Sequence, residues 1–95
     1  MPVKRMRDVF RAISDPRRRS IIKLLAQKRM TVADIESHFD ISRPAIFEQI
    51  KILDECHLLI VTRAENKKYF AINLKKLDHV ITWVEKLKRK KRSAH

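Results

Sequence analysis

The chain is organised around residues 41–54, which read ISRPAIFEQIKILD. The hydroxyl of Ser42 can cap the first turn of a helix, and Pro44 is tolerated early in a helix because no intrahelical donor is needed there. Apolar residues then recur at helical spacing and define one face, formed by Ile46, Ile50 and Leu53. These features predict a helix that begins abruptly at Ser42 and ends near Cys56 or His57.

A shorter helix is predicted just before this segment. Thr31 and Asp34 have the spacing of a capping box, with Asp in place of the usual Glu, and a short helix to about His38 follows. Phe39 and Asp40 then make the turn into the longer helix. Two helices joined in this way have the outline of a helix-turn-helix, in which the second helix enters the major groove of DNA.

The composition of the chain restricts its function. Its 95 residues suffice for one domain, and 23 Lys and Arg against 11 Asp and Glu give a formal charge of +12. This charge favours a polyanionic partner, with nucleic acid ahead of an anionic membrane surface. No apolar run approaches the roughly 20 residues of a membrane span, so we expect a cytoplasmic protein without membrane contact. Glycine is absent and Cys56 is the only cysteine, which excludes a Gly-rich phosphate loop, an intrachain disulfide and a multi-cysteine metal cluster.

Two helices are predicted on the N-terminal side of the helix-turn-helix. Apolar stripes place them at residues 4–13 and 16–27. Asp15 is a good N-cap for the second helix, and Pro16 occupies its favoured first position. The cations at residues 17–19 oppose the dipole of this helix, so we expect a compensating anion from the protein or from DNA phosphate.

A β-hairpin and a last helix are predicted on the C-terminal side. Alternating β-branched and aromatic residues predict strands at residues 59–63 and 68–72, joined by a polar turn with a basic tip. The helix that follows ends in a cationic run, residues 86–92, which is expected to be frayed. The predicted fold is mainly α-helical with a β-hairpin wing, a winged helix-turn-helix. It forms a single domain with residues 88–95 as a basic C-terminal tail.

Five short segments, in fitting order and spacing, resemble the ArsR/SmtB family of bacterial repressors. They are AISDPRRR (12–19), IKLL (22–25), MTVADI (30–35), IS with IKIL (41–42 and 50–53) and KYFAIN (68–73). The resemblance extends over roughly residues 9–84. It implies a homodimer that is held together by the first and last helices, binds an inverted repeat in double-stranded DNA and represses transcription. It also implies a location in the bacterial cytoplasm, associated with the nucleoid.

The metal sites of the family have no counterpart in this sequence. The thiolate site would lie on the helix that begins at Thr31, but Thr31 and Ala33 stand where cysteines are needed. The other site needs acidic and histidine ligands spaced along the last helix, whereas Asp78 and His79 are adjacent and the segment from Lys90 offers cations. The resemblance therefore implies the metal-independent branch of the family, without a cofactor. Such autorepressors are relieved by a protein or small-molecule inducer, here unidentified, or by promoter competition.

The helix that follows Ser42 carries the candidates for base recognition. They are Ser42, Arg43, Pro44, Phe47, Glu48, Gln49 and Lys51. Arg43 has the geometry to pair with guanine, Glu48 can accept a hydrogen bond from cytosine, and Gln49 reads adenine only if it turns away from the buried side. Two interpretations of Phe47 stay open, because it can press on thymine methyl groups or pack against a neighbouring helix.

Contacts with phosphate and with a second subunit are expected from other elements. The hairpin offers polar and basic residues for phosphate, namely Arg63, Asn66, Lys67 and Lys68, and weaker contacts are expected from Arg17 and Arg18. The dimer interface is expected to use apolar residues of the first and last helices, which are Met6, Val9, Phe10, Ile13, Leu77, Val80, Ile81, Val84 and Leu87.

The charge of the reading unit keeps two alternatives open. Residues 30–60 hold two Lys or Arg against six Asp or Glu, a net charge of −4. The alternatives are a basic protein that coats nucleic acid without sequence preference and a winged-helix module for protein contact. An enzyme is not expected, because no nucleophile, base and oxyanion donor have a recognisable spacing. Cys56, His38 and His79 are interpreted as core or surface residues, with a thiol switch across a dimer as the alternative for Cys56.

Overall fold

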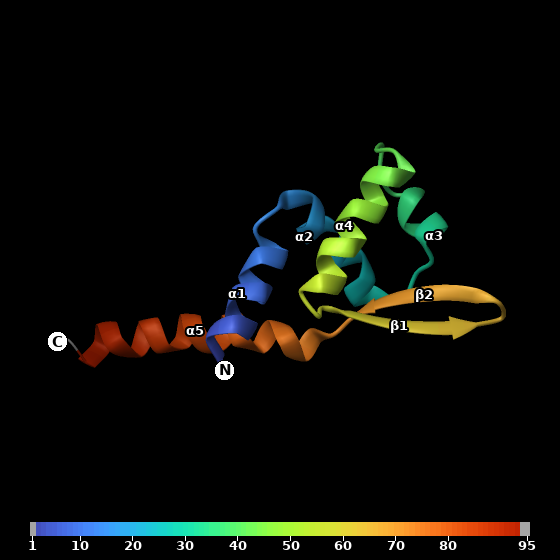
Figure 1. The fold of residues 1–95 in the computed structure, drawn as a ribbon. Helices are drawn as coiled ribbons and strands as arrows, with labels where there is room; N and C mark the ends of the chain where they lie inside the picture. Colours follow the sequence, from blue (N-terminus) through green and yellow to red (C-terminus); the bar gives the residue numbers. More distant parts are fainter. Residues whose placement is uncertain (1, 94–95) are drawn as a thin grey trace.

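The computed structural model describes the backbone of residues 2–93 and the side chains of residues 7–91. Five helices and a two-stranded antiparallel sheet follow one another in the predicted order (Figure 1). Their bounds are α1 (Pro2–Ile13), α2 (Pro16–Gln27), α3 (Val32–Glu36), α4 (Arg43–Glu55), β1 (Leu59–Ala64), β2 (Lys67–Ile72) and α5 (Leu74–Ser93). The hairpin and the C-terminal end of α5 project in opposite directions from the other helices (Figure 1).

The helix starts follow the capping signals of the sequence. Asp15 accepts the backbone N–H of Arg17 at 2.7 Å, and this bond lowers the pKa of the Asp15 carboxyl. Thr31 and Asp34 form the predicted capping box, and its bonds lower the pKa of Asp34. Ser42 caps α4 by accepting the N–H of Ala45 at 3.3 Å.

The short helix α3 ends two residues before its predicted limit. After Glu36 the backbone bonds change from the four-residue to the three-residue spacing, since the N–H groups of His38 and Phe39 donate to Ile35 and Glu36. Ser37 also donates its hydroxyl to the carbonyl of Asp34 at 2.7 Å. These local bonds tighten the turn between α3 and α4.

The hairpin turn is tighter than expected. Ala64 pairs with Lys67, so only Glu65 and Asn66 form the loop, and both adopt left-handed backbone with φ of 53° and 64°. Two such residues make the primed turn that matches the twist of the strands. A bridge between Met30 and Phe70 in β2, with N–O distances of 2.9 and 2.8 Å, anchors the hairpin to the segment before α3.

The core lies between α1, α2, α4 and the base of the hairpin. Its fully buried members include Ile21, Ile46, Leu53 and Leu58. Cys56 belongs to this cluster with 1% of its surface exposed, and desolvation raises the pKa of its thiol. The structure thus agrees with the interpretation of Cys56 as a packing residue.

The last helix includes the cationic run of its C-terminal end. Residues 86–93 continue α5 as regular helix, and the expected fraying of this end stays a prediction. Lys and Arg are good helix formers, the segment has no Gly or Pro, and cations near a helix C-terminus interact favourably with its dipole. Earlier in the helix, the ring of Trp83 packs edge-to-face on Phe10 of α1 with centroids 5.2 Å apart. Across residues 2–93 no helix is long and apolar enough to cross a membrane.

Candidate nucleic-acid interface

The start of α4 is fixed to the end of α3 by an ion pair. The Nε and Nη2 atoms of Arg43 donate to Oε1 of Glu36 at 3.1 and 2.6 Å. This hydrogen bonding lowers the pKa of Glu36 and raises the pKa of Arg43. Both side chains remain partly exposed, so the guanidinium stays accessible at the surface. The pair holds Arg43 in place while leaving it available for exchange with another acceptor.

Three side chains form a row along the outward face of α4, which we call the α4 row: Arg43, Phe47 and Lys51. They are spaced by four residues, so they lie one above another on the helix surface. All three are exposed, and half of the surface of Phe47 remains accessible to solvent. Pro44 and Glu48 are also exposed beside the row. The alternative in which Phe47 is buried against a neighbouring helix is therefore not what the structure shows.

Gln49 does not belong to this face. It is half-buried, and its Oε1 accepts a hydrogen bond from Nη1 of Arg18 on α2 at 3.1 Å. The predicted reading role of Gln49 required a side chain turned outward. Helical periodicity places position 49 beside the buried Ile46 and Ile50 instead, and the buried Arg18 supplies its partner.

Arg18 was predicted as a phosphate contact, and the structure contradicts this role. Only 8% of its surface is exposed, and its guanidinium donates to the carbonyls of Ala12 and Arg11 at 3.0 and 2.9 Å and to Ser14 Oγ at 3.3 Å. These carbonyls end α1, where a cation interacts favourably with the helix dipole. The compensating anion expected for the basic start of α2 is Asp15, whose carboxylate lies 3.8 Å from Nη1 of Arg18, and the carbonyls at the C-terminus of α1 add to it.

The other two arginines of this segment stay at the surface. Arg19 donates to the carbonyl of Ile13 at 2.8 Å, which adds a second cation to the end of α1. Arg17 is exposed, as a phosphate contact would require. Arg17 therefore remains a candidate, while Arg18 is removed from the set.

The hairpin presents a cluster of exposed polar and basic residues, which we call the wing cluster: Arg63, Asn66, Lys67 and Lys68. Arg63 and Lys68 are directly opposite each other on β1 and β2. Like charges in such a pair repel each other, so a bound anion would stabilise this arrangement. The wing cluster thus lies where the sequence predicted it and has the charge that a phosphate backbone requires.

One cation near the wing was missed by the sequence analysis. The guanidinium of Arg29 lies over the ring of Tyr69, 4.3 Å from its centroid, and Nη1 donates to Thr62 Oγ1 at 3.5 Å. Arg29 precedes Met30, which bridges to β2, and this pairing brings it to the hairpin. Nothing in the local sequence indicates the pairing, because it joins segments about 40 residues apart in the chain.

A groove of about 250 Å³ separates α4 from the hairpin. Its walls are Phe47, Ile50, Lys51 and Asp54 from the helix and Val61, Lys68 and Phe70 from the strands. The lining is more apolar than polar, and the Lys68 ammonium lies 5.4 Å from the centroid of the Phe70 ring. The groove joins the α4 row to the wing cluster in one surface.

Comparison with known proteins shows which protein family this chain belongs to. Residues 15–61 match the family described as "Bacterial regulatory protein, arsR family". The chain is also 39% identical over 79 residues to the transcriptional repressor SdpR of Bacillus subtilis, covering 83% of this chain and 88% of that protein. The chain belongs to the ArsR family. It is a transcriptional regulator with a DNA-binding fold and not an enzyme.

Solved structures confirm the fold of this ArsR-family protein. An ArsR-like transcriptional regulator from Rhodococcus sp. RHA1 superposes with a TM-score of 0.84 at 19% identity, covering 95% of this chain and 85% of that one. The homodimeric winged helix-turn-helix DNA-binding domain of Mb0332 from Mycobacterium bovis gives 0.72 at 19% identity, covering 98% and 86%. The predicted winged helix-turn-helix is therefore confirmed.

The ArsR-family chain also exposes an apolar strip on α5. Ile81, Val84 and Leu87 lie on one side of the helix and remain largely accessible, with Ile81 56% exposed. Leu77 and Val80 are half-buried, as are Phe10 and Ile13 on α1. Val9, in contrast, is completely buried within the protomer and cannot contribute to a dimer surface, so its predicted role is corrected. The side chain of Met6 lies outside the described residues.

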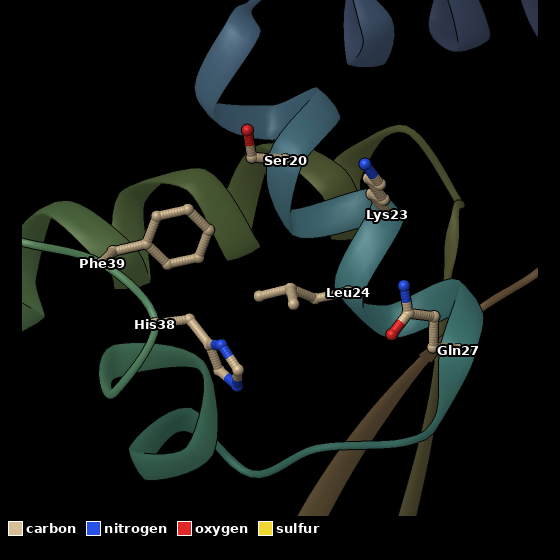
Figure 2. Close-up of a pocket in the computed structure, with 6 residues that line it drawn as sticks. All are labelled: Ser20, Lys23, Leu24, Gln27, His38 and Phe39. Carbon is tan, nitrogen blue, oxygen red and sulfur yellow. The ribbon is translucent and has the colours of Figure 1, made fainter.

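A second depression of about 280 Å³ lies between α2 and the turn that follows α3 (Figure 2). Leu24 and Phe39 form its apolar part, with His38 beside them. Ser20, Lys23 and Gln27 are exposed, and their polar atoms point in different directions (Figure 2). The polar groups do not converge on a common point, so this depression lacks the arrangement that fixes a small ligand.

The positions that correspond to the family's two metal sites do not form a metal-binding group among the residues that the structure describes. Thr31 Oγ1 is occupied as the N-cap acceptor for the N–H of Asp34 at 3.2 Å. Asp78 is exposed on α5, and the adjacent His79 is half-buried. Within the described part of this ArsR-family chain, no three His, Cys, Asp or Glu side chains are grouped closely enough to hold a metal ion.

Proposed function

We propose that this protein is a homodimeric repressor that binds an inverted-repeat operator through the α4 row and the wing cluster. The observation that carries this proposal is the continuity of the two surfaces across the groove between α4 and the hairpin. In a two-fold symmetric dimer the two copies of α4 enter successive major grooves, with half-sites about 34 to 36 Å apart. Occupation of a promoter by such a dimer blocks transcription.

The two surfaces have different tasks in this proposal. The α4 row contributes one guanidinium, one aromatic ring and one ammonium, with Ser42, Pro44 and Glu48 around it. Base-edge contacts of this kind select a sequence, whereas contacts with phosphate supply most of the affinity. The wing cluster and Arg17 supply the phosphate contacts, and Arg29 adds a cation at the base of the wing.

Dimerisation is assigned to the exposed strip of α5 together with the end of α1 that packs on it. Ile81, Val84 and Leu87 form an apolar surface that a monomer would leave in water. Phe10 and Trp83 already join α1 to α5 within one protomer, so both helices can present one continuous face. The homodimeric state of the Mb0332 domain, which has the same fold, supports this assignment.

We further propose that repression by this protein does not depend on a metal at the usual family positions. Thr31 and Ala33 cannot supply thiolates, and the Thr31 oxygen already serves α3 as its cap. An inducer, whether protein or small molecule, would then act by another route. We place the protein in the bacterial cytoplasm, where its operator DNA is found.

Fluorescence anisotropy with a selected duplex tests the proposal. A duplex enriched from a random pool by the full chain should bind on the order of a thousandfold more tightly than a scrambled duplex at physiological salt. Zinc and the chelator EDTA should leave this affinity unchanged. Equal binding of both duplexes would instead identify a protein that coats DNA, an alternative favoured by the exposed cationic end of α5.

A further inference from the structure

Building on the proposed function, we propose that Phe47 reads the C5 methyl group of thymine, so that the operator half-site carries thymine opposite the middle of α4. The thymine methyl is the one apolar group that a base pair presents in the major groove, and phenylalanine is among the side chains that contact it. The inference names the base class that this residue selects.

Phe47 is half exposed on the flank of α4. It is the only aromatic residue of this helix, and half of its surface is accessible beside the buried Ile46 and Ile50. An aromatic ring in this state gains free energy when a partner removes its remaining surface from water. In the α4 row the ring lies between Arg43 and Lys51, the side chains suited to guanine and to phosphate.

The spacing of the α4 row places Phe47 between two residues proposed to contact DNA. A rise of about 1.5 Å per residue puts Phe47 about 6 Å along the helix from both Arg43 and Lys51. Adjacent base pairs are stacked about 3.4 Å apart, so the ring lies within two base steps of either neighbour. If Arg43 and Lys51 contact the duplex, Phe47 between them lies within reach of base edges.

The surroundings of the Phe47 ring also suit a methyl group. On the side of the hairpin, Phe47 borders an apolar groove whose other wall includes Val61 and Phe70, and Lys51 and Lys68 flank this groove. A largely apolar groove with two lysines in its lining suits a methyl-bearing base edge that lies between phosphates. The carboxylates of Glu48, exposed next to Phe47 on α4, and of Asp54, in the groove lining, repel phosphate, which favours uncharged base edges beside the ring.

The test uses 2′-deoxyuridine, which keeps the hydrogen-bonding pattern of thymine and lacks only its methyl group. Each thymine of the selected operator is replaced in turn, and affinities are measured by anisotropy for the full chain and for Phe47→Ala. With the unmodified protein, replacement at one or two thymines per half-site should weaken binding about three- to fivefold for each methyl lost. With Phe47→Ala the same replacements should have no effect.

Controls separate this inference from the proposed function. Ile60→Ala removes an apolar side chain of the hairpin that is exposed to a similar degree, and it should retain the full sensitivity to deoxyuridine. Circular dichroism checks that Phe47→Ala remains folded, as its exposure predicts. A selected operator that tolerates deoxyuridine at every thymine, or a sensitivity that persists in Phe47→Ala, would overturn the role of Phe47 while leaving the repressor intact. Failure to enrich any duplex would overturn both.

Discussion

Arg18 on α2 donates a hydrogen bond from Nη1 to Oε1 of Gln49 on α4 over 3.1 Å. The same guanidinium donates to the carbonyls of Arg11 and Ala12 at the end of α1. One buried side chain thus connects α4 with α1, the helix that packs on α5 through Phe10. Together with the ion pair between Arg11 of α1 and Glu55 of α4 at 3.3 Å, this contact helps to set the orientation of the proposed reading helix relative to the proposed dimer helices.

Replacing Arg18 by methionine should destabilise the fold. The substitution keeps an apolar stem but leaves two carbonyls and the Gln49 oxygen without their charged donor, at a cost of about 2 to 3 kcal/mol in the free energy of unfolding. Urea denaturation followed by circular dichroism measures it. Arg19→Met is the matched control, because exposed Arg19 makes a single bond to Ile13 and its loss should matter much less. Equal effects of the two substitutions would refute the structural role of Arg18.

Glu36→Gln should strengthen operator binding by about two- to fivefold. Arg43 must exchange its bonds to Glu36 for bonds to DNA, and an exposed ion pair opposes this exchange only weakly. Arg43→Ala should instead weaken binding by tenfold or more and relax selection at one base pair. Anisotropy titrations at constant salt provide both values. Weaker binding by Glu36→Gln would mean that the pair is needed to position α3 against α4.

Lys67→Ala should reduce affinity by a similar factor for operator and scrambled duplexes. Phosphate contacts carry no sequence information, which is why both duplexes should lose affinity equally. The plot of log affinity against log salt concentration should also become less steep by about one unit, because one phosphate contact is lost. Titrations at several salt concentrations measure the slope. Lys75→Ala, which removes an exposed cation of α5, serves as the control. A slope unchanged by Lys67→Ala would remove Lys67 from the wing cluster's phosphate contacts.

Ile81→Asp should shift the protein towards the monomer and weaken operator binding. The carboxylate would be buried without a partner in the proposed interface, which is costly. Size-exclusion chromatography with light scattering gives the mass directly. Thr82→Asp introduces the same charge at the neighbouring exposed position on the other side of α5 and should leave the mass unchanged. A dimer that survives Ile81→Asp would place the interface elsewhere.

Acid should weaken the helix caps of α2 and α3. Asp15 and Asp34 have pKa values below the ordinary 3.8 because backbone N–H groups donate to them. Their contribution to stability is therefore fully present above that value and is lost as the pH falls through the lower pKa of the folded state. Asn is an equally good N-cap but neither titrates nor pairs with the Arg18 guanidinium, which lies 3.8 Å from the Asp15 carboxylate, so Asp15→Asn should lose a little stability at pH 7 and show a smaller decline below pH 4. Denaturation midpoints between pH 7 and pH 3 test this, and an unchanged decline would contradict it.

Much of the fold was predictable because its signals are local. Asp15 with Pro16, Thr31 with Asp34, and Ser42 each start a helix through a bond that spans two or three residues, and all three caps formed as expected. The alternating pattern of the hairpin was also sufficient to place its strands. The predicted and observed elements differ mainly at their ends. There a single backbone hydrogen bond decides whether a residue belongs to the element or to the turn, as at Glu65 and Asn66 in the hairpin.

The sequence by itself determined the family, the order of the helices and strands, and the outward placement of Arg43 and Lys51, because helical periodicity fixes which residues share a face. The exposure of Phe47, which the sequence left open, was decided by the tertiary structure. Only the tertiary structure decided that Arg18 is a buried link to Gln49 and that Arg29 reaches the wing. Both side chains are long and cationic, and a sequence cannot distinguish a cation bound for solvent or phosphate from one captured by carbonyls or an aromatic ring. That choice depends on which distant segments pack beside it, here the end of α1 and the ring of Tyr69.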